Sequence, residues 1–250
     1  MEARRLVAAV VAVVGAGAVV VAGAAPAGAA SSSASALYRD ALATTHSWSV
    51  HYESTSTEST ESSESSESSE SSETLLESGD AAPAAASQTV TMGKGSIDIL
   101  VIGGISYLKG NAGGLESLAG LSSSQATEAS GRWIEFSTGN AAFAPVVEGV
   151  RSADIAKELA LKAPLSLGHA RTLQGQAVDA IDGTQTFGRT SQHVVLYVRA
   201  KGTHIPVEED SVNAKGQHTA AEHIIYSKWG ERVRPEAPSA TISVGSISAV

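Results

Sequence analysis

Cysteine is absent from the 250 residues of this chain. The protein therefore has no disulfide, no thiolate metal site and no cysteine nucleophile. Acylation of a bacterial lipoprotein also needs a cysteine directly after the cleavage site of its leader, so a lipid anchor of that kind is excluded. Stability must come from an ordinary hydrophobic core.

Basic residues are scarce as well. The chain has 17 Lys and Arg against 26 Asp and Glu, a formal net charge of −9. Residues 1–30 contain Glu2, Arg4 and Arg5, so the remainder has 25 acids and 15 bases, a net charge of −10. Because no basic patch stands out, we expect no binding of nucleic acid. Aromatic residues make up only 4% of the chain, so alanine, glycine and aliphatic residues must fill most of the core.

Long apolar runs are limited to one, Leu6–Ala25. It follows a positively charged start and precedes Ala27 and Ala29, a pattern typical of a secretory signal. We predict a signal peptide over residues 1–30 and a secreted, extracellular protein, with transient contact or association with the cell envelope as an alternative. An uncleaved anchor is the alternative, because the run approaches the ~20 residues that cross a bilayer. Residues 31–250 are expected to form one domain, as a monomer.

One low-complexity tract interrupts this domain. Glutamate recurs at every third position from Glu58 to Glu73, and no apolar residue occurs between Ser54 and Thr74. A period of three fits neither a strand nor a helix, and serine disfavours helix interiors. We therefore expect a disordered insertion at about residues 54–74. A tandem expansion without function is the leading interpretation; O-glycosylation, weak binding of divalent cations and an electrostatic brush are the alternatives.

The ordered part changes its periodicity along the chain. A helix over residues 33–45 is followed by strands, among them a hairpin at 96–102 and 105–110 around a Gly-Gly turn. The middle third favours helices, with a short extended piece at 132–136. From residue 165 onward the pattern alternates again and predicts an antiparallel meander. This order indicates an α+β fold, with helices packed against one face of a curved antiparallel sheet.

Four segments carry a resemblance to a known family. They occur in the order "LVIGGISYLKGN" (100–111), "GRWIEF" (131–136), "LYVRAKGTHIPVEED" (196–210) and "YSKWGERVRPEAP" (226–238). Together they resemble the LppX/LprAFG family of actinobacterial lipid-carrier lipoproteins, which is related in fold to the LolA/LolB carriers. The resemblance implies a half-barrel of antiparallel strands whose concave face is covered by helices, with an apolar cavity that holds acyl chains. Members carry a lipobox cysteine, which this chain lacks, so membrane tethering is not implied.

The patterns for catalysis and metal binding are weak. His46 and His51, like His218 and His223, are five residues apart, which places each pair on opposite faces of a strand. The "SYLK" segment beginning at Ser106 matches SxxK only formally, because that motif works from a helix. The carboxylates of "VEEDSVN" lack EF-hand spacing, and we interpret them as a solvated hairpin loop. We therefore predict no enzyme, no metal site and no cofactor, with an unrecognised hydrolase as a distant possibility.

The leading hypothesis is an exported, non-enzymatic binding protein for a lipid or other amphipathic small molecule. The candidate ligand-binding residues are apolar positions in strands that are apolar on both faces, together with two aromatic residues expected to cover the mouth of the cavity. A core role for each of them is the alternative, and an extracellular structural or interaction module with a closed core is the alternative for the protein. The strand positions are Ile99, Val101, Val194, Leu196 and Val198, and the covering aromatics are Trp133 and Phe143.

Overall fold

The computed structural model describes residues 28–61, 70–187, 190–215 and 218–247. The predicted signal peptide lies almost wholly outside these residues and stays a prediction. No helix in the described part of the chain has the length and apolar character needed to cross a membrane.

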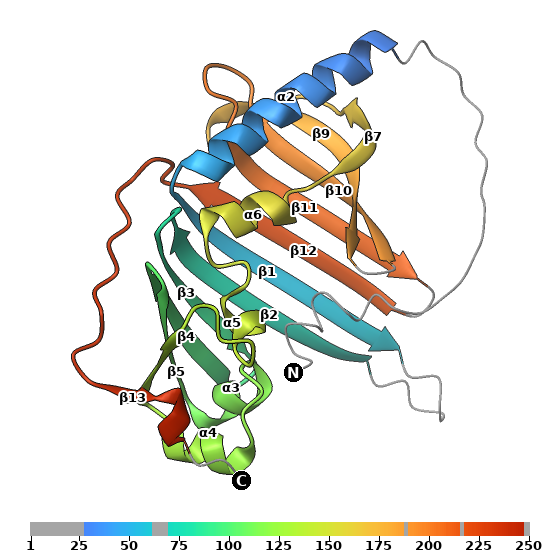
Figure 1. Ribbon diagram of the computed structural model, residues 1–250. Helices are drawn as coiled ribbons and strands as arrows, with labels where there is room; N and C mark the ends of the chain where they lie inside the picture. The colour runs from blue at the N-terminus through green and yellow to red at the C-terminus, as the bar shows by residue number, and fades with distance from the viewer. Residues whose placement is uncertain (1–27, 62–69, 188–189, 216–217, 248–250) are drawn as a thin grey trace.

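Long strands dominate the described residues (Figure 1). The helices are α2 (Gly28–Ser47), α3 (Ala112–Ser117), α4 (Ser123–Ala129), α5 (Ala144–Val147), α6 (Ser152–Glu158) and the 3-10 turn η1 (Val244–Ser246). The strands are β1 (Val50–Glu61), β2 (Glu70–Ala81), β3 (Ala85–Met92), β4 (Gly95–Ile102), β5 (Ile105–Gly110), β6 (Trp133–Ser137), β7 (Lys162–Leu167), β8 (Arg171–Leu173), β9 (Gln176–Phe187), β10 (Thr190–Arg199), β11 (Pro206–Lys215), β12 (His218–Ser227) and β13 (Thr241–Ser243).

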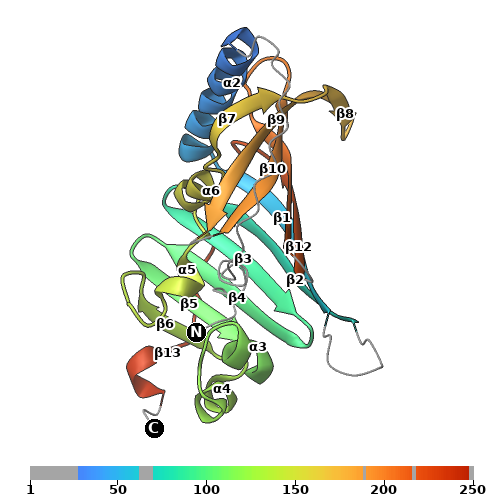
Figure 2. The same ribbon diagram turned by 90° about the vertical axis from the view of Figure 1, so that its right-hand side faces the viewer.

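All of these strands belong to one sheet. Its order is β13-β6-β5-β4-β3-β2-β1-β12-β11-β10-β9-β7, and β8 pairs with β9 as a branch. Every pair is antiparallel except β13 with β6. The sheet is strongly curved, its two end strands do not pair, and α2 and α6 lie on its concave side (Figure 2). The predicted fold, a curved and unclosed antiparallel sheet with helices on its concave face, is confirmed.

The predicted hairpin between β4 and β5 forms with the expected register. Ile102 pairs with Ile105 across the Gly103-Gly104 turn. Gly103 has a φ of +61°, a conformation that residues with a side chain rarely adopt. Along β4 the buried residues alternate, so only one face of this strand packs against the core.

The acidic tract differs from the expectation of disorder at both of its ends. β1 continues to Glu61 and β2 begins at Glu70, and these two residues are register partners. β1 also pairs with β12 from His51 to Thr60, so its backbone has a strand on either side. Hydrogen bonds to the two neighbouring strands order this backbone although it carries no apolar side chains. The periodicity of a single segment cannot predict such pairing. Residues 62–69 lie outside the described residues, and for them the expectation of disorder stays a prediction.

The helical pattern of the middle third begins with two short helices, α3 and α4. A turn at Gly120, where φ is +71°, separates them. Each helix has its own N-terminal cap: the Asn111 side chain accepts from the Gly114 N–H at 2.7 Å, and Ser122 forms a capping box with Gln125. Each cap begins a separate helix, and the spacing of the apolar residues alone does not predict the interruption between them.

Two apolar clusters form the core of the concave side. We call the first the β4 cluster, because it is built around Ile97, Ile99 and Val101 and is covered by α3, α4 and α5. We call the second the β10 cluster, because it is built around Leu196 and Val198 and is covered by α2 and α6. The two clusters lie in opposite halves of the sheet, with β1 and β2 between them (Figure 1).

Candidate functional site

The concave face is apolar at its two ends and polar in its middle. Strand register defines one row of residues that runs directly across the sheet from β4 to β9. Its ends are aliphatic, whereas carboxylates and a hydroxyl interrupt its centre. In order, the row is Ile97, Val90, Glu77, Ser54, Ile224, Glu209, Leu196 and Ile181.

All five predicted strand positions point to this concave face. Ile99 and Val101 lie in the β4 cluster, and Val194, Leu196 and Val198 lie in the β10 cluster. Each side chain is completely buried. The structure therefore brings the five residues to one face but divides them between two clusters.

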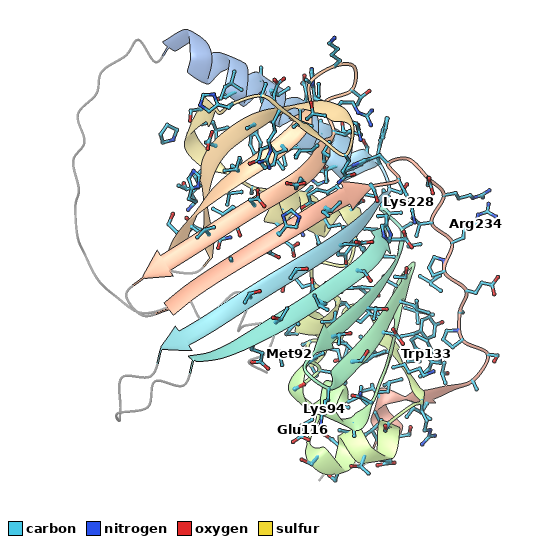
Figure 3. The ribbon with its side chains drawn as sticks, turned by 180° about the vertical axis from the view of Figure 1, so that it is seen from behind. Met92, Lys94, Glu116, Trp133, Lys228 and Arg234 are labelled. Carbon is cyan, nitrogen blue, oxygen red and sulfur yellow. The ribbon has the colours of Figure 1, made fainter. Side chains whose placement is uncertain are left out.

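The two predicted covering aromatics are separated. Phe143 lies in the β4 cluster and stacks on Phe136, with ring centroids 4.7 Å apart. Trp133 lies on β6, whose residues Ile134 and Phe136 are buried in the same cluster. Because side chains alternate along a strand, Trp133 points to the opposite, convex face, where Figure 3 shows it. Lys109 places its Nζ 5.7 Å from the centroid of the Trp133 ring.

Glu209 is the most deeply buried carboxylate of the polar middle. It is only 4% exposed, on β11 between Leu196 of β10 and Ile224 of β12. Its Oε1 accepts from Gln185 Nε2 at 3.2 Å, and its Oε2 accepts from the Tyr226 hydroxyl at 3.5 Å. Loss of hydration on burial and, to a smaller extent, the neighbouring carboxylates of Glu222 and Glu158 together raise the pKa of Glu209 to about 8. The predicted solvated loop at residues 207–213 is thus wrong: this segment belongs to β11.

Glu222 extends the polar middle toward β1. Its Oε1 accepts from the Ser54 hydroxyl at 3.0 Å. Burial raises the pKa of Glu222, and the charge of Glu77 acts in the same direction. The centre of the concave face thus concentrates carboxyl groups that resist ionisation.

The helices over the β10 cluster are joined by one buried tyrosine. Tyr38 lies on the inner side of α2 with Ala34 and Ala41, at the spacing of an amphipathic helix. Its hydroxyl donates to the Leu159 carbonyl at 2.9 Å and accepts from the Leu161 N–H at 2.6 Å. Burial raises the pKa of this hydroxyl, which stays protonated and keeps its role as a donor.

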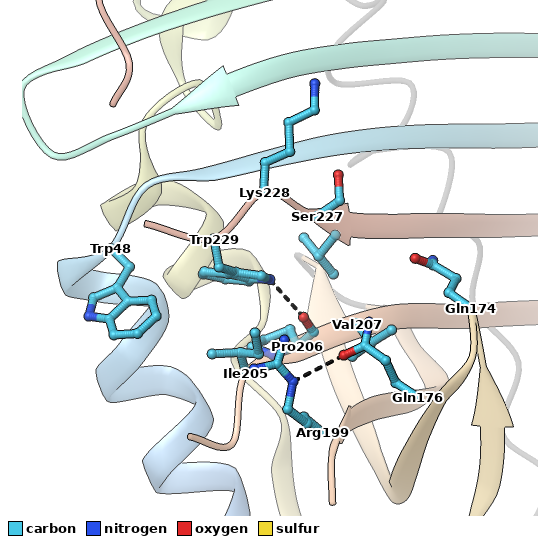
Figure 4. Close-up of a pocket in the computed structure, with 11 residues that line it drawn as sticks. Trp48, Gln174, Gln176, Arg199, Ile205, Pro206, Val207, Ser227, Lys228 and Trp229 are labelled. Carbon is cyan, nitrogen blue, oxygen red and sulfur yellow. Dashed lines mark hydrogen bonds between the residues drawn. The ribbon is translucent and has the colours of Figure 1, made fainter. Parts of the chain in front are cut away.

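Two open surface hollows in the described part of the chain bear on the site, and six of the seven predicted site residues line neither of them. The first, of about 300 Å³, lies between Trp48, Arg199 and Trp229 (Figure 4). The second, of about 360 Å³, lies on the convex face over β2, β3 and β4, and Trp133 is the predicted residue that borders it. Four of its polar side chains are bonded to one another: His51 to Asp80 at 2.8 Å, and Thr89 to Asp98 at 2.8 Å.

Among the residues that the structure describes, three side chains lie close enough together to hold a metal ion. Ligand atoms of Glu208, Asp210 and His223 lie within 4.8 Å of one another on β11 and β12. Arg171 neutralises the same carboxylates, with its Nη2 3.0 Å from Glu208 Oε1 and 3.5 Å from Asp210 Oδ2. Its guanidinium also stacks on the Tyr197 ring at 3.7 Å. The arrangement is therefore complete as an ion-pair network.

The formal SxxK match separates in the structure. Ser106 is buried and bonds through its hydroxyl to Thr138 at 2.9 Å. Lys109, three residues along β5, instead reaches the ring of Trp133. The two side chains make no contact that catalysis requires.

The residues that line the first hollow were missed by sequence reasoning. They come from the β8–β9 turn, the end of β10, the start of β11 and the end of β12, together with Trp48 before β1. Two of the segments quoted for the family resemblance, residues 196–210 and 226–238, meet here. Both segments place apolar residues beside a basic residue and a turn, and this was the signal for a site that the sequence offered. Only the strand pairing shows that the two segments meet.

Comparisons with known proteins identify the fold. No protein-family model matches the chain, and no curated protein is detectably similar to it in sequence. The structure of LprF from Mycobacterium bovis is 15% identical with a TM-score of 0.50, over 85% of this chain and 100% of that one. Lipoprotein LppX from Mycobacterium tuberculosis is 16% identical with a TM-score of 0.48, over 81% and 98%. The chain thus has the fold of LprF, while membership of the actinobacterial family stays a prediction.

Proposed function

We propose that this protein is an exported, non-enzymatic binding protein for a lipid or another amphipathic molecule, held between the concave face and its helices. One observation carries the proposal: the concave side of an unclosed sheet presents two apolar clusters, separated by a polar middle. An amphipathic ligand has the same division into apolar and polar parts. The fold shared with LprF and the family resemblance of the sequence support the same assignment.

Entry of a ligand requires the covering helices to move. The helices over the β4 cluster are short, and α5 has only four residues. Over the β10 cluster, α2 is held to the α6 segment through the Tyr38 hydroxyl. The short helices α3, α4, α5 and α6 have little stability of their own, so they can be displaced without disrupting the sheet.

A second function is favoured by the burial of the same residues. Ile99, Val101, Val194, Leu196 and Val198 are completely buried against their neighbours. An extracellular structural or interaction module with a closed core accounts for this packing without a ligand.

Native mass spectrometry of protein purified from its own host separates the two functions. The binding protein is expected to carry a lipid that is released on activation, whereas the closed module is a bare polypeptide that also fails to enhance the fluorescence of hydrophobic dyes. The bare result in repeated preparations would contradict the proposal.

A pair of variants on one strand locates the ligand. Val194→Phe fills space on the concave face and is expected to reduce the lipid occupancy. Val195→Phe is the matched control, because the next side chain on β10 points to the convex face and packs on another cluster. Val101→Phe tests the β4 cluster in the same way, and circular dichroism establishes that each variant is folded. Equal occupancy in all three variants would place the ligand elsewhere.

A further inference from the structure

The hollow at the rim of the sheet has a lining unlike the rest of this acidic protein. It measures about 300 Å³ and is bordered by Trp48, Gln174, Gln176, Arg199 and Lys228, with further residues of β11 and β12. Neither Asp nor Glu contributes to the lining, although the chain as a whole has a net charge of −9. The site is thus locally cationic.

Arg199 is held in place without being neutralised. Its Nε donates to Gln176 Oε1 at 3.0 Å, a neutral partner (Figure 4). Among the described residues Arg199 forms no ion pair, whereas Arg171 is paired with Glu208. A guanidinium that is fixed through one nitrogen keeps its other donors for an anion, in a geometry suited to carboxylate or phosphate.

Apolar side chains also line the hollow. Trp229 is fixed by its indole N–H, which donates to the Pro206 carbonyl at 2.9 Å. Trp48 is 40% exposed, and a side-chain carbon placed on Gly230 would lie 3.7 Å from its ring, so the Gly230 backbone packs close to this indole. Ile205 and Val207 belong to the same lining. Two indoles and two aliphatic side chains thus line the same hollow as Arg199, a combination that suits a ligand with a charged end and an apolar part.

We propose that this hollow binds a small organic anion. Arg199 holds its carboxylate or phosphate, Gln174 and Gln176 donate from their amides, and its ring or aliphatic part lies against Trp48 and Trp229. A volume of about 300 Å³ admits roughly ten non-hydrogen atoms, at the ~30 Å³ that a water molecule occupies in the liquid. Lys228 stands at the rim, with its side chain directed away from Arg199, and adds positive charge to the approach (Figure 4).

Phenyl phosphate is the probe, and isothermal titration calorimetry on the full mature chain is the measurement, with quenching of tryptophan fluorescence as a second readout. The wild type is expected to bind phenyl phosphate at least about tenfold more tightly than the neutral benzyl alcohol, because a hydrogen bond to a charged group is worth ~1.5–3 kcal/mol. Equal affinity for the two probes, or no binding of phenyl phosphate at millimolar concentration, would overturn the proposal.

Three variants test the role of the cation. Arg199→Gln is expected to weaken binding of phenyl phosphate by about tenfold or more. Gln174→Glu, at an exposed position of the lining, places a negative charge in the hollow and is expected to weaken binding without affecting the fold. Arg171→Gln is the matched control and is expected to leave the affinity unchanged, because Arg171 does not line the hollow. The same loss in all three variants would contradict the assignment.

The anion has two sources, a free metabolite or the headgroup of an amphipathic ligand. Dihexanoyl phosphatidic acid distinguishes them: a headgroup site binds it more tightly than phenyl phosphate, whereas a site for free anions shows no gain. Val194→Phe is expected to reduce lipid occupancy and to leave the binding of phenyl phosphate intact. Failure of this anion site can therefore be told apart from failure of the proposed lipid binding.

Discussion

In the middle of the concave face, the Glu209 carboxyl is buried without forming an ion pair among the described residues, which is electrostatically unfavourable. Glu209 lies between two aliphatic neighbours in the strand register, and its hydrogen-bond donors, Gln185 and Tyr226, are both neutral. A carboxylate in this position lacks a cation to replace its hydration. Its pKa of about 8 follows from that burial and makes the folded state bind a proton that the unfolded state releases.

The stability of the protein should therefore fall with rising pH. A carboxyl whose folded pKa is above its unfolded value contributes stability that is fully present below about pH 4.5 and is lost as the pH rises through about 8. Replacing Glu209 with Gln keeps the shape and removes the ionisation: the amide oxygen can still accept from Gln185, and the amide N–H can donate to the Tyr226 hydroxyl. We expect Glu209→Gln to match the wild type near pH 5 and to exceed it by a few kcal/mol at pH 9.

Urea unfolding at pH 5, 7 and 9 measures this difference. Glu208→Gln is the control, because Glu208 lies one residue away and pairs with Arg171. If wild type and Glu209→Gln lose stability in parallel across this range, the burial of an uncompensated carboxyl is not the cause.

At the scale of elements, the β1–β2 hairpin joins the two halves of the sheet. β1 and β2 share a ladder from Val50 and Ala81 to Glu61 and Glu70. Near its base the hairpin contributes Tyr52 and Leu75 to the two clusters, whereas no apolar residue occurs beyond Leu75 toward the tip. Its base and its tip should therefore differ in their importance for stability.

Shortening the hairpin in register tests that difference. Glu58 and Glu73 are paired, so replacing residues 59–72 with an Asn-Gly turn keeps the ladder below them intact. We expect the melting temperature to stay within a few degrees of wild type. Replacing residues 55–76 with the same turn also joins a register pair, Ser54 and Glu77, but removes buried Leu75. That variant should lose about 2–5 kcal/mol, and equal melting of the two variants would show that the tip contributes as much as the core.

Sequence patterns predicted the elements whose signal is local. The Gly-Gly hairpin, the helix before β1 and the C-terminal meander all follow from turn residues and alternation, whereas residues 132–136 were expected only to be extended or irregular. The strand character of Thr55–Glu61 was missed because it comes from pairing with β2 and β12, not from its own side chains. For the same reason sequence reasoning placed Glu209 in solvent: only the pairing of β10, β11 and β12 buries it.

The candidate ligand-binding residues were selected by residue type, and their role in binding stays a prediction. Ile99 and Leu196 were chosen because they lie in apolar runs, and the sequence left open which side of each strand faces a cavity. It did not show that these residues belong to separate clusters, because sheet order cannot be read from periodicity. Trp133 was assigned to the helical insert, but the short strand β6 turns its ring to the convex face.

The whole molecule joins two cores through one backbone network. The β4 and β10 clusters share no covering helix, yet consecutive pairing of neighbouring strands from β4 through β1 to β10 connects them. If either cluster loses its packing, the concave face of that half of the sheet becomes exposed to solvent. The two halves should consequently unfold together.

One truncation in each cluster tests this coupling. Ile99→Ala and Leu196→Ala each remove a completely buried side chain and should each cost about 2–5 kcal/mol. We expect both variants to shift the same single transition, with an unchanged dependence on urea. Two transitions, or a loss of stability confined to one probe of one half, would show that the clusters are independent units.

The position of β1 in the sheet has a consequence for how the polypeptide is made. β1 ends at Glu61, but β12, its neighbour on one side, begins only at His218. While the ribosome adds the 156 residues between them, the first strand has one row of N–H and C=O groups with no partner of its own chain. A nascent chain stalled anywhere in that interval would present a template for intermolecular pairing, so completion of synthesis up to β12 is the step that protects this protein from aggregation.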